Sequence, residues 1–340
     1  MSTPTIKKLG SAYSMSMNDI YNKNMSFNLK SKHWSNLYKS NKFGDCIKLE
    51  ELKDFRSNKS SLSEGLDDSF HREVPFRAFS DLSAKVGYEF LYKNLQDNNI
   101  GNSHNLIKYR DKFLDFNRLF HISWLKELDD KVFSDESFWK VHSGKPILCE
   151  IGGGFGSFSE LILRNRDLNL LSIDLPEANI LSSYYLSRNF PKKSFFLYDD
   201  YIKNGRCITQ DIVDSFDIII QPPFVQIDPS IKISLFSNTR SFMEMEFKVV
   251  SKYFEFIQEY IADNGYLLNV NRYEKRTAGE PIRINEYPYD SRWKVVSSEP
   301  SFFQPHIHSL LTKRINSLQE GDILNELDSI KDITKHFKET

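Results

Sequence analysis

Cysteine is scarce in this chain: three occur among 340 residues, at Cys46, Cys149 and Cys207. They lie far apart, form no CxxC pair and lack histidines at metal-binding spacing, so neither a disulfide framework nor a zinc cluster is expected. Long apolar runs are also missing, since no stretch reaches the roughly 18 residues that a membrane-spanning helix needs. The N-terminus has no apolar core of a secretion signal. We therefore expect a cytoplasmic protein without a membrane span.

An excess of charge of one sign is lacking as well. The 45 Lys and Arg residues balance 46 Asp and Glu residues, and the formal net charge is -1. Such a chain has no basic field for binding the phosphates of DNA or RNA, and nucleic acid is not expected as the main partner. Aromatic residues, in contrast, make up 14% of the chain, mostly Phe (27) and Tyr (16). They can fill a core or line a pocket, and composition leaves both uses open.

The hydrophobic pattern changes near residue 146. Before it, residues 106–128 carry apolar side chains three and four positions apart, which predicts a helix. We therefore expect a mainly helical N-terminal unit at residues 1–145 that helps to shape a binding site, with roughly the first 25 residues disordered or loosely packed. A second domain follows at 146–315, and residues 316–340 form a polar C-terminal tail.

After residue 146, short apolar runs alternate with amphipathic ones. Strands that alternate with helices favour an α/β fold with a parallel, doubly wound sheet. The predicted strands lie at 147–151, 168–174, 194–198, 216–221, 231–238, 265–272, 293–297 and 306–315, and the predicted helices at 158–165, 176–189 and 242–262.

The most informative segment is ILCEIGGGFGSFSE, directly after the change of pattern. Gly152, Gly154 and Gly156 follow a predicted buried strand, and Ser157 with Glu160 has the S-x-x-E spacing of a helix capping box. Strand, glycine turn and helix thus follow one another without a gap. Because glycines let the backbone come close to a ligand at the carboxyl edge of a parallel sheet, this turn predicts a nucleotide-binding site.

The residues around the turn indicate which nucleotide it binds. A dinucleotide fingerprint starting at Gly152 needs Gly or Ala at position 157, where this chain has serine. The carboxylate of Glu150 would repel a pyrophosphate but suits a ligand with an ammonium group and no phosphate, such as S-adenosylmethionine. Asp174 ends the second strand, where an acid can accept both ribose hydroxyls of an adenosine. Two alternatives stay open: Asp174 as a helix N-cap before Pro176, and Glu150 as an anchor for loop amides.

The runs CEIGGGFGSFSE and SIDLPEA resemble class I S-adenosylmethionine-dependent methyltransferases. DLPEANILSSYYLSRNFP, SNTRSFMEME, YLLNVNRYEKRTAGEPIRINEYPYDSRWKVV and FFQPHIHSLLTKR resemble the sugar O-methyltransferase family found in bacterial polysaccharide and glycan gene clusters. The resemblance implies an α/β fold with a Rossmann-like, seven-stranded methyltransferase sheet. It also implies that S-adenosylmethionine is bound by Glu150, Gly152, Gly154, Gly156 and Asp174, to which we add Asn238 at the end of the predicted strand 231–238.

The third position in the sheet is ambiguous. Two predicted strands, in SFFLYDD and FDIIIQPPF, compete for it. Depending on which one is chosen, either Asp199 or the turn after Ile220 would face the adenine of the cofactor.

The resemblance further implies methyl transfer to a hydroxyl of a sugar, nucleotide-linked or in a glycan, during polysaccharide biosynthesis. Such a hydroxyl is a weak nucleophile near neutral pH, so we expect a general base at the carboxyl edge of the sheet. No metal is expected. The candidate bases are Glu244, His306 and His308, and the candidate acceptor-binding residues are Arg240, Arg272 and Tyr273.

Each candidate has a structural alternative. Glu244 can cap or solvate the helix that follows, and the two histidines can belong to the core or the surface. Tyr287, Tyr289 and Trp293 can present ring faces to a sugar or fill the core. Alternative functions are a methyltransferase for another small metabolite, such as an amine or a phenol, and a non-catalytic Rossmann-like binding module. An NAD-dependent sugar enzyme is a weaker alternative because of the imperfect fingerprint.

Overall fold

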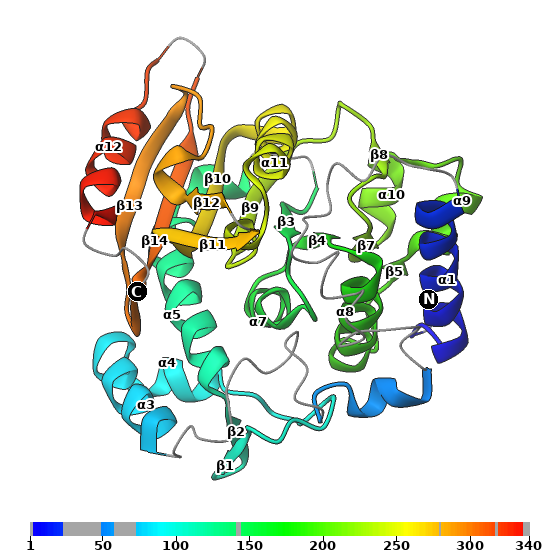
Figure 1. The fold of residues 1–340 in the computed structure, drawn as a ribbon. Helices are drawn as coiled ribbons and strands as arrows, with labels where there is room; N and C mark the ends of the chain where they lie inside the picture. Colours follow the sequence, from blue (N-terminus) through cyan, green and yellow to red (C-terminus); the bar gives the residue numbers. More distant parts are fainter. Residues whose placement is uncertain are drawn as a thin grey trace.

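The computed structural model of the chain describes residues 3–22, 49–57, 73–140, 144–278, 280–316 and 319–335. An eight-stranded sheet lies at its centre, with helices packed around it (Figure 1). In spatial order, the strands are β13 (Trp293–Ser301), β14 (Gln304–Arg314), β10 (Ile261–Arg272), β9 (Ile233–Thr239), β3 (Ile147–Ile151), β4 (Asn169–Ile173), β7 (Ile218–Gln221) and β5 (Phe195–Phe196).

The sheet is mostly parallel. Strands β10, β9, β3, β4, β7 and β5 run in one direction, whereas β14 is antiparallel to its neighbours β10 and β13. Every residue of β3 and β4 is buried, which explains their continuous apolar runs. The carboxyl ends of the parallel strands meet at one edge, where sheets of this kind bind ligands. This is the predicted α/β, Rossmann-like fold, although the sheet has eight strands instead of seven.

The additional strand explains the ambiguity at the third position. Strand β7, from FDIIIQPPF, pairs directly with β4, and the two-residue strand β5 pairs with the outer side of β7. The turn after Gln221 therefore lies beside the end of β4, where the backbone N–H of Asp174 donates to the Gln221 carbonyl at 3.3 Å. Asp199 instead lies in helix α9 (Tyr198–Lys203), where its carboxylate pairs with Lys203 at 3.1 Å.

The first two helices predicted after residue 146 begin close to their predicted positions, whereas α9 and α10 (Gln210–Ser215) were not predicted. Helices α7 (Ser157–Asn165) and α8 (Pro176–Asn189) follow β3 and β4. The long helix expected over 242–262 is interrupted, however. It consists of a short 3-10 helix, η2 (Phe242–Glu244), and of α11 (Phe247–Tyr260), separated at Met245 by extended backbone with φ -111° and ψ 154°. As a result, Glu244 lies in the connection after β9 and outside the long helix.

The prediction that the start of the chain is disordered or loosely packed is wrong for residues 6–22. They form helix α1 (Ile6–Asn22), which packs against α8 and α9 of the second domain (Figure 1). Leu9 and Tyr13 are buried in this contact. Asp19 accepts hydrogen bonds from the Tyr198 hydroxyl at 2.7 Å and from Arg206 at 2.8 Å. The buried face of α1 has a partner only in the folded chain, because α8 and α9 are distant in the sequence.

The remainder of the N-terminal unit is mainly helical. The helix predicted over 106–128 begins later than expected, because Arg110 adopts φ 57° and turns the preceding residues into a hairpin. Asp115 then caps the helix by accepting from the N–H of Asn117 at 2.9 Å. The elements of this unit are η1 (Leu49–Asp54), α3 (Glu73–Val86), α4 (Tyr88–Lys93), β1 (Ile107–Tyr109), β2 (Lys112–Leu114), α5 (Phe116–Lys131) and α6 (Glu136–Trp139).

The end of the chain contains a helix with one buried face. Helix α12 (Ile323–Thr334) packs against β13 and against η3 (Ile284–Glu286), and buries Ile323 and Ile330. The expected polar tail is thus ordered over this part. Among the described residues, no helix is both long and apolar enough to cross a membrane. The smaller elements are β6 (Cys207–Ile208), α10 (Gln210–Ser215), β8 (Gln226–Ile227), β11 (Glu274–Ala278) and β12 (Glu280–Arg283).

Candidate active site

The glycine turn after β3 needs three glycines for its backbone. Gly152, Gly154 and Gly156 have φ values of 70°, 61° and 84°, in the left-handed region that side chains disfavour. Gly152 also has no room for a Cβ atom, which would lie 1.9 Å from the Ser241 hydroxyl oxygen. A Cβ atom on Gly154 would meet no atom within 4 Å. The backbone of Gly154 is therefore open on the side from which a ligand can approach.

Asp174 holds this turn. One of its carboxylate oxygens accepts from the N–H of Gly154 at 2.8 Å, and the other accepts from the N–H of Leu175 at 2.7 Å. It is not the N-cap of α8, because Leu175 occupies that position. The pKa of Asp174 is raised to about 7, mainly by burial and in addition by the nearby carboxylates of Glu177 and Glu244. A cationic ligand would favour the ionised carboxylate and offset this shift.

Glu150 lies beneath the same turn and is fully buried. One carboxyl oxygen accepts a hydrogen bond from the Ser159 hydroxyl, and the other has no hydrogen-bond partner. A Cβ atom at position 153 would lie 2.3 Å from this carboxyl group, so Gly153 is needed for packing. Burial raises the pKa of Glu150 to about 7, with a further contribution from the charge of Asp174. The arrangement leaves a buried acceptor that a ligand with an ammonium group can satisfy.

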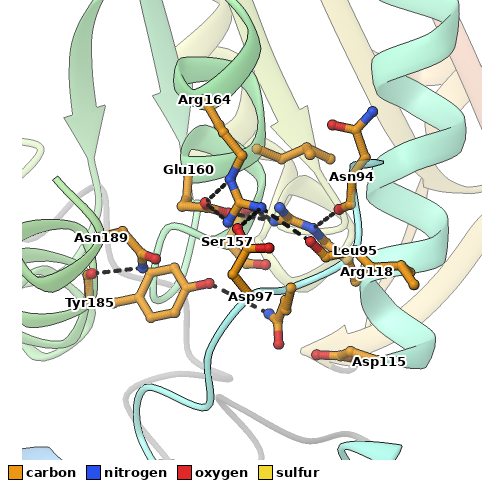
Figure 2. Close-up of polar contacts among 12 residues, drawn as sticks. Asn94, Leu95, Asp97, Asp115, Arg118, Ser157, Glu160, Arg164, Tyr185 and Asn189 are labelled. Atoms are coloured by element: carbon orange, nitrogen blue, oxygen red, sulfur yellow. Dashed lines mark hydrogen bonds and ion pairs between the residues drawn. The ribbon is translucent and has the colours of Figure 1, made fainter. Parts of the chain in front are cut away.

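The capping box predicted from Ser157 and Glu160 is absent. The N-cap of α7 is Gly156, without a side-chain cap, and Glu160 points to the N-terminal unit. It accepts from Arg118 of α5 at 2.6 Å and from the Nε of Arg164 at 2.8 Å (Figure 2). Arg118 also donates to the carbonyl of Ser157 at 3.0 Å. A buried ion pair thus connects the helix that follows the glycine turn to the N-terminal unit.

A second contact connects the N-terminal unit to the turn itself. The ring of Phe155, inside the turn, packs edge-on against Phe55 and Tyr185 at 5.6 and 4.9 Å between ring centroids. The guanidinium of Arg56 lies 5.0 Å from the centre of the Phe155 ring and pairs with Asp115 at 2.8 Å. Sequence spacing could not reveal the contacts of Phe55 and Arg56 with Phe155, because these residues are distant in the sequence.

Asn238 lies at the carboxyl end of β9 and is fully buried. Its amide donates to the Ile151 carbonyl at 2.9 Å and to the Ser241 hydroxyl at 3.1 Å. Its oxygen accepts from the N–H of Phe242 at 3.1 Å and from Asn271 at 3.0 Å. All of its hydrogen-bonding groups are therefore used within the chain, and in this conformation Asn238 braces the strand ends beside the turn.

Two of the predicted acceptor-side residues lie in the connection that follows β9. Arg240 is half-buried and adopts φ 68°, with its backbone N–H donating to the Val270 carbonyl at 2.7 Å. Glu244 is also half-buried, and its carboxylate lies 3.5 Å from the Lys275 ammonium. The charge of Glu244 contributes to the raised pKa of Asp174, which places the two carboxylates in the same electrostatic environment.

His308 and Tyr273 come together but face away from solvent. Nδ1 of His308 lies 2.8 Å from the Tyr273 hydroxyl, and Nε2 lies 2.8 Å from the Ser298 hydroxyl, which donates to Glu326 of α12 at 2.5 Å. Burial lowers the pKa of His308 to about 4. This chain of hydrogen bonds leads outward to α12, so neither His308 nor Tyr273 presents a free group to an acceptor. His306 is half-buried.

The remaining residues that were predicted to bind the acceptor or to face a sugar lie in two different places. Arg272 ends β10 at the same edge as Arg240. Tyr287, Tyr289 and Trp293 are buried in an aromatic core with Phe254, which supports the packing alternative over a sugar-facing role. Among the described residues, no group of three His, Cys, Asp or Glu side chains could hold a metal ion.

His121 of α5 is a candidate that sequence reasoning missed. Its ring is half-buried against Trp124 and Phe158, at 5.5 and 5.4 Å between centroids, and its Nδ1 is buried without a hydrogen-bond partner. Its pKa is lowered to about 3, mainly by burial and in addition by the charges of nearby arginines, among them Arg118 and Arg240. The imidazole is thus neutral at physiological pH. No motif surrounds it in the sequence, and its position near the turn depends on how α5 packs.

Comparison with known proteins yields structural likeness only. No protein-family model matches the sequence, and no curated protein matches it. An rRNA methylase from Streptococcus thermophilus is 11% identical, with a TM-score of 0.32, over 53% of this chain and 92% of its own. An O-methyltransferase family 2 protein from Planctomyces limnophilus, in complex with apigenin, is 12% identical, with a TM-score of 0.30, over 75% of this chain and 65% of its own.

An O-methyltransferase from neocarzinostatin biosynthesis, in complex with S-adenosylmethionine, is 11% identical to the chain, with a TM-score of 0.33. The match covers 72% of this chain and 69% of that protein. Similarity at this level says nothing about the substrate of this chain. The fold assignment rests on the chain's own strand order, and the site on its own residues.

Proposed function

We propose that this chain is an S-adenosylmethionine-dependent O-methyltransferase. The observation that carries the proposal is the pair of carboxyl groups, Glu150 and Asp174, held against a three-glycine turn at the carboxyl edge of a parallel sheet. Burial raises the pKa of both groups to about 7. A ligand with positive charge and no phosphate would favour their ionised forms, whereas the pyrophosphate of a dinucleotide would be repelled.

The residues present fit this cofactor. The two oxygens of Asp174 each accept one backbone hydrogen bond and keep further lone pairs for the ribose hydroxyls of an adenosine. The unpaired oxygen of Glu150 would accept from an ammonium group. Gly154 leaves its backbone open for close approach. When bound, S-adenosylmethionine would supply a methyl group attached to a positively charged sulfonium sulfur. Transfer of this methyl group is a single in-line displacement, in which the sulfur is the leaving group.

The acceptor is proposed to be a sugar hydroxyl, nucleotide-linked or in a glycan, in polysaccharide or glycan biosynthesis. This proposal rests on the sequence resemblance and is supported by the polar character of the edge around Arg240, Glu244 and Lys275. An amine or a phenol is the alternative acceptor. The chain's main contribution would be orientation of the acceptor oxygen, which can supply about 7 to 11 kcal/mol of the barrier.

The acceptor hydroxyl must also lose its proton. Glu244, half-buried at this edge, is the proposed base, and the neutral imidazole of His121 is the second candidate. Either would take the proton as the oxygen attacks, for a gain of roughly 10² to 10⁴ in rate. His306 remains a candidate on the strand beside β10, whereas both ring nitrogens of His308 are already hydrogen-bonded.

Cofactor binding is the first test. Isothermal titration calorimetry with S-adenosylmethionine and S-adenosylhomocysteine should show binding that Gly154→Arg abolishes, because the new side chain would fill the open side of the turn. Gly205→Arg is the matched control: Gly205 also has a positive φ, 79°, and no atom within 4 Å of an added Cβ, but it lies between α9 and β6. Absence of binding in the unmodified protein would refute the proposal.

A methyl-transfer screen tests the acceptor. Formation of S-adenosylhomocysteine would be measured with nucleotide sugars, free sugars, an amine and a phenol as acceptors. Turnover with a sugar and not with the amine or phenol is the expected result. Turnover confined to the amine or the phenol would retain the methyltransferase and reject the sugar assignment. Cofactor binding without turnover of any acceptor would favour the non-catalytic module.

A further inference from the structure

Arg240 has an unusual backbone conformation, which determines the direction of its side chain. It is one of the few described residues other than glycine with a positive φ, 68°. The strand pattern would otherwise place its side chain on the same face as Asn238, two residues earlier. The N–H of Arg240 is bound to the Val270 carbonyl of β10 at 2.7 Å, so the irregular conformation is part of the sheet edge.

The position of Arg240 relative to the glycine turn is also well defined. Its neighbour Ser241 packs directly on Gly152, where an added Cβ would lie 1.9 Å from the Ser241 hydroxyl oxygen. Two residues earlier, Asn238 donates to the Ile151 carbonyl at the start of the turn. Arg240 is therefore held one strand away from the proposed cofactor site, where the acceptor must lie to receive the methyl group.

The guanidinium of Arg240 has no hydrogen bond or ion pair among the described residues, although the side chain is half-buried. Arg272, at the end of the adjacent strand β10, is close enough to repel it. Glu244 is the acidic group that acts on Arg240, and its carboxylate already lies near the Lys275 ammonium. At this edge, the charges of Glu244 and Arg272 therefore act on Arg240 in opposite senses. A guanidinium is a planar group with several N–H donors, which suits it to bind a carboxylate or a phosphate.

We infer that the acceptor carries an anionic group, bound by Arg240 with Arg272 beside it. The inference rests on the proposed methyltransferase function and narrows its substrate class. Two sources share the required chemistry: the carboxylate of a sugar acid and the phosphate of a nucleotide-linked sugar. A neutral sugar would leave the half-buried guanidinium of Arg240 without a counter-charge, and so would bind more weakly.

The test uses the full chain saturated with S-adenosylhomocysteine and titrated by calorimetry with glucuronate, UDP-glucose and glucose. At least one anionic probe should bind about tenfold or more tightly than glucose, in keeping with charge-assisted hydrogen bonds. A preference for glucuronate identifies the carboxylate, and a preference for UDP-glucose the phosphate. Arg240→Gln should remove this advantage, whereas the control Arg188→Gln, an exposed arginine at the end of α8, should keep it.

Two results would overturn the inference: equal affinity for glucose and both anions, or an anion preference that survives Arg240→Gln. Binding of S-adenosylhomocysteine is measured first in each variant, and Arg240→Gln should retain it, which shows that the fold and the cofactor site are intact. If the unmodified chain fails to bind S-adenosylhomocysteine, the proposed function itself is wrong. The anion titrations without cofactor then decide whether Arg240 forms an anion site on its own.

Discussion

The carboxylate of Asp174 accepts a hydrogen bond from the backbone N–H of Gly154 at 2.8 Å. These two residues come from different strand ends, and their contact joins the glycine turn after β3 to the end of β4. The same carboxylate that would bind a ribose therefore also holds the turn. Ligand binding and the conformation of the turn are coupled through one side chain.

Asp174→Ala should weaken binding of S-adenosylhomocysteine by about 1 to 3 kcal/mol, because ribose hydroxyls and the Gly154 N–H would lose an acceptor. Calorimetry measures the affinity, and thermal unfolding shows whether the variant is folded. Asp228→Ala is the matched control, since Asp228 also accepts a backbone hydrogen bond, from Ser230 at 2.9 Å, but in a turn after β8. Unchanged affinity in Asp174→Ala would assign the residue a purely structural role.

Cofactor affinity should depend on pH. The pKa values of Glu150 and Asp174 are raised to about 7, so below that pH these carboxyls are increasingly protonated in the free protein. A cationic ligand requires them ionised, so affinity should rise between pH 5 and 7 and level off above. The folding stability of the ligand-free protein should change with pH in the opposite direction. Because the pKa values of these two carboxyls are raised in the folded state, their contribution to stability is greatest at low pH and is lost as the pH rises towards 7.

Calorimetry from pH 5 to 8, in pairs of buffers with different ionisation enthalpies, would measure both the affinity and the protons released on binding. Glu150→Gln cannot ionise and should reduce the pH dependence and the proton release, while Glu136→Gln, an exposed residue on α6, should change neither. A flat profile in the unmodified protein would contradict this account of the two carboxyls.

The ion pair between Arg118 and Glu160 should matter for stability. Both side chains are almost completely inaccessible, and their charged atoms lie 2.6 Å apart. Glu160→Gln would leave a buried guanidinium without its counter-charge, at a cost of about 3 to 5 kcal/mol in unfolding free energy. Urea denaturation is the measurement. Disruption of the exposed Glu136–Lys140 pair should leave the unfolding midpoint unchanged. Equal effects of the two changes would contradict the role assigned to Glu160.

The general base can be identified by separating turnover from cofactor affinity. Glu244→Gln should lower kcat by roughly 10² to 10⁴ if Glu244 takes the proton, with little change in affinity for S-adenosylhomocysteine. His121→Gln and His306→Ala provide the same comparison for the two histidines. The variant that loses turnover while keeping cofactor affinity identifies the base. A parallel loss of affinity would indicate a structural role for that residue.

His308 should contribute to stability through its two hydrogen bonds. His308→Ala would remove the hydrogen bonds that its ring forms with the Tyr273 and Ser298 hydroxyls, at a cost of about 1 to 3 kcal/mol. Because burial lowers the pKa of His308 to about 4, its contribution to stability should fall as the pH drops from about 6.5 towards 4. Urea denaturation across this range tests both points. An unfolding free energy that does not change in the variant would refute them.

Much of the second domain follows from local sequence. Strands β3 and β4 and helix α8 lie close to their predicted positions, because continuous apolar runs, turn glycines and a helix-opening proline act over a few residues. Predictions from local sequence failed where a side chain interacts more strongly with a residue that is distant in the sequence. The S-x-x-E spacing at Ser157 favoured a capping box, but the buried Arg118 attracts Glu160 away from the helix end.

The sequence by itself determined the strand, glycine turn and helix, and the acids that flank them, because those features depend on neighbours along the chain. Tertiary structure decided that β7 lies beside β4, that α1 packs on the second domain, and that His308 faces Tyr273. It also placed the ring of His121 of α5 against Phe158 of α7. These relationships join residues that are far apart in the chain, and their energy comes from burial and charge pairing that exist only after packing.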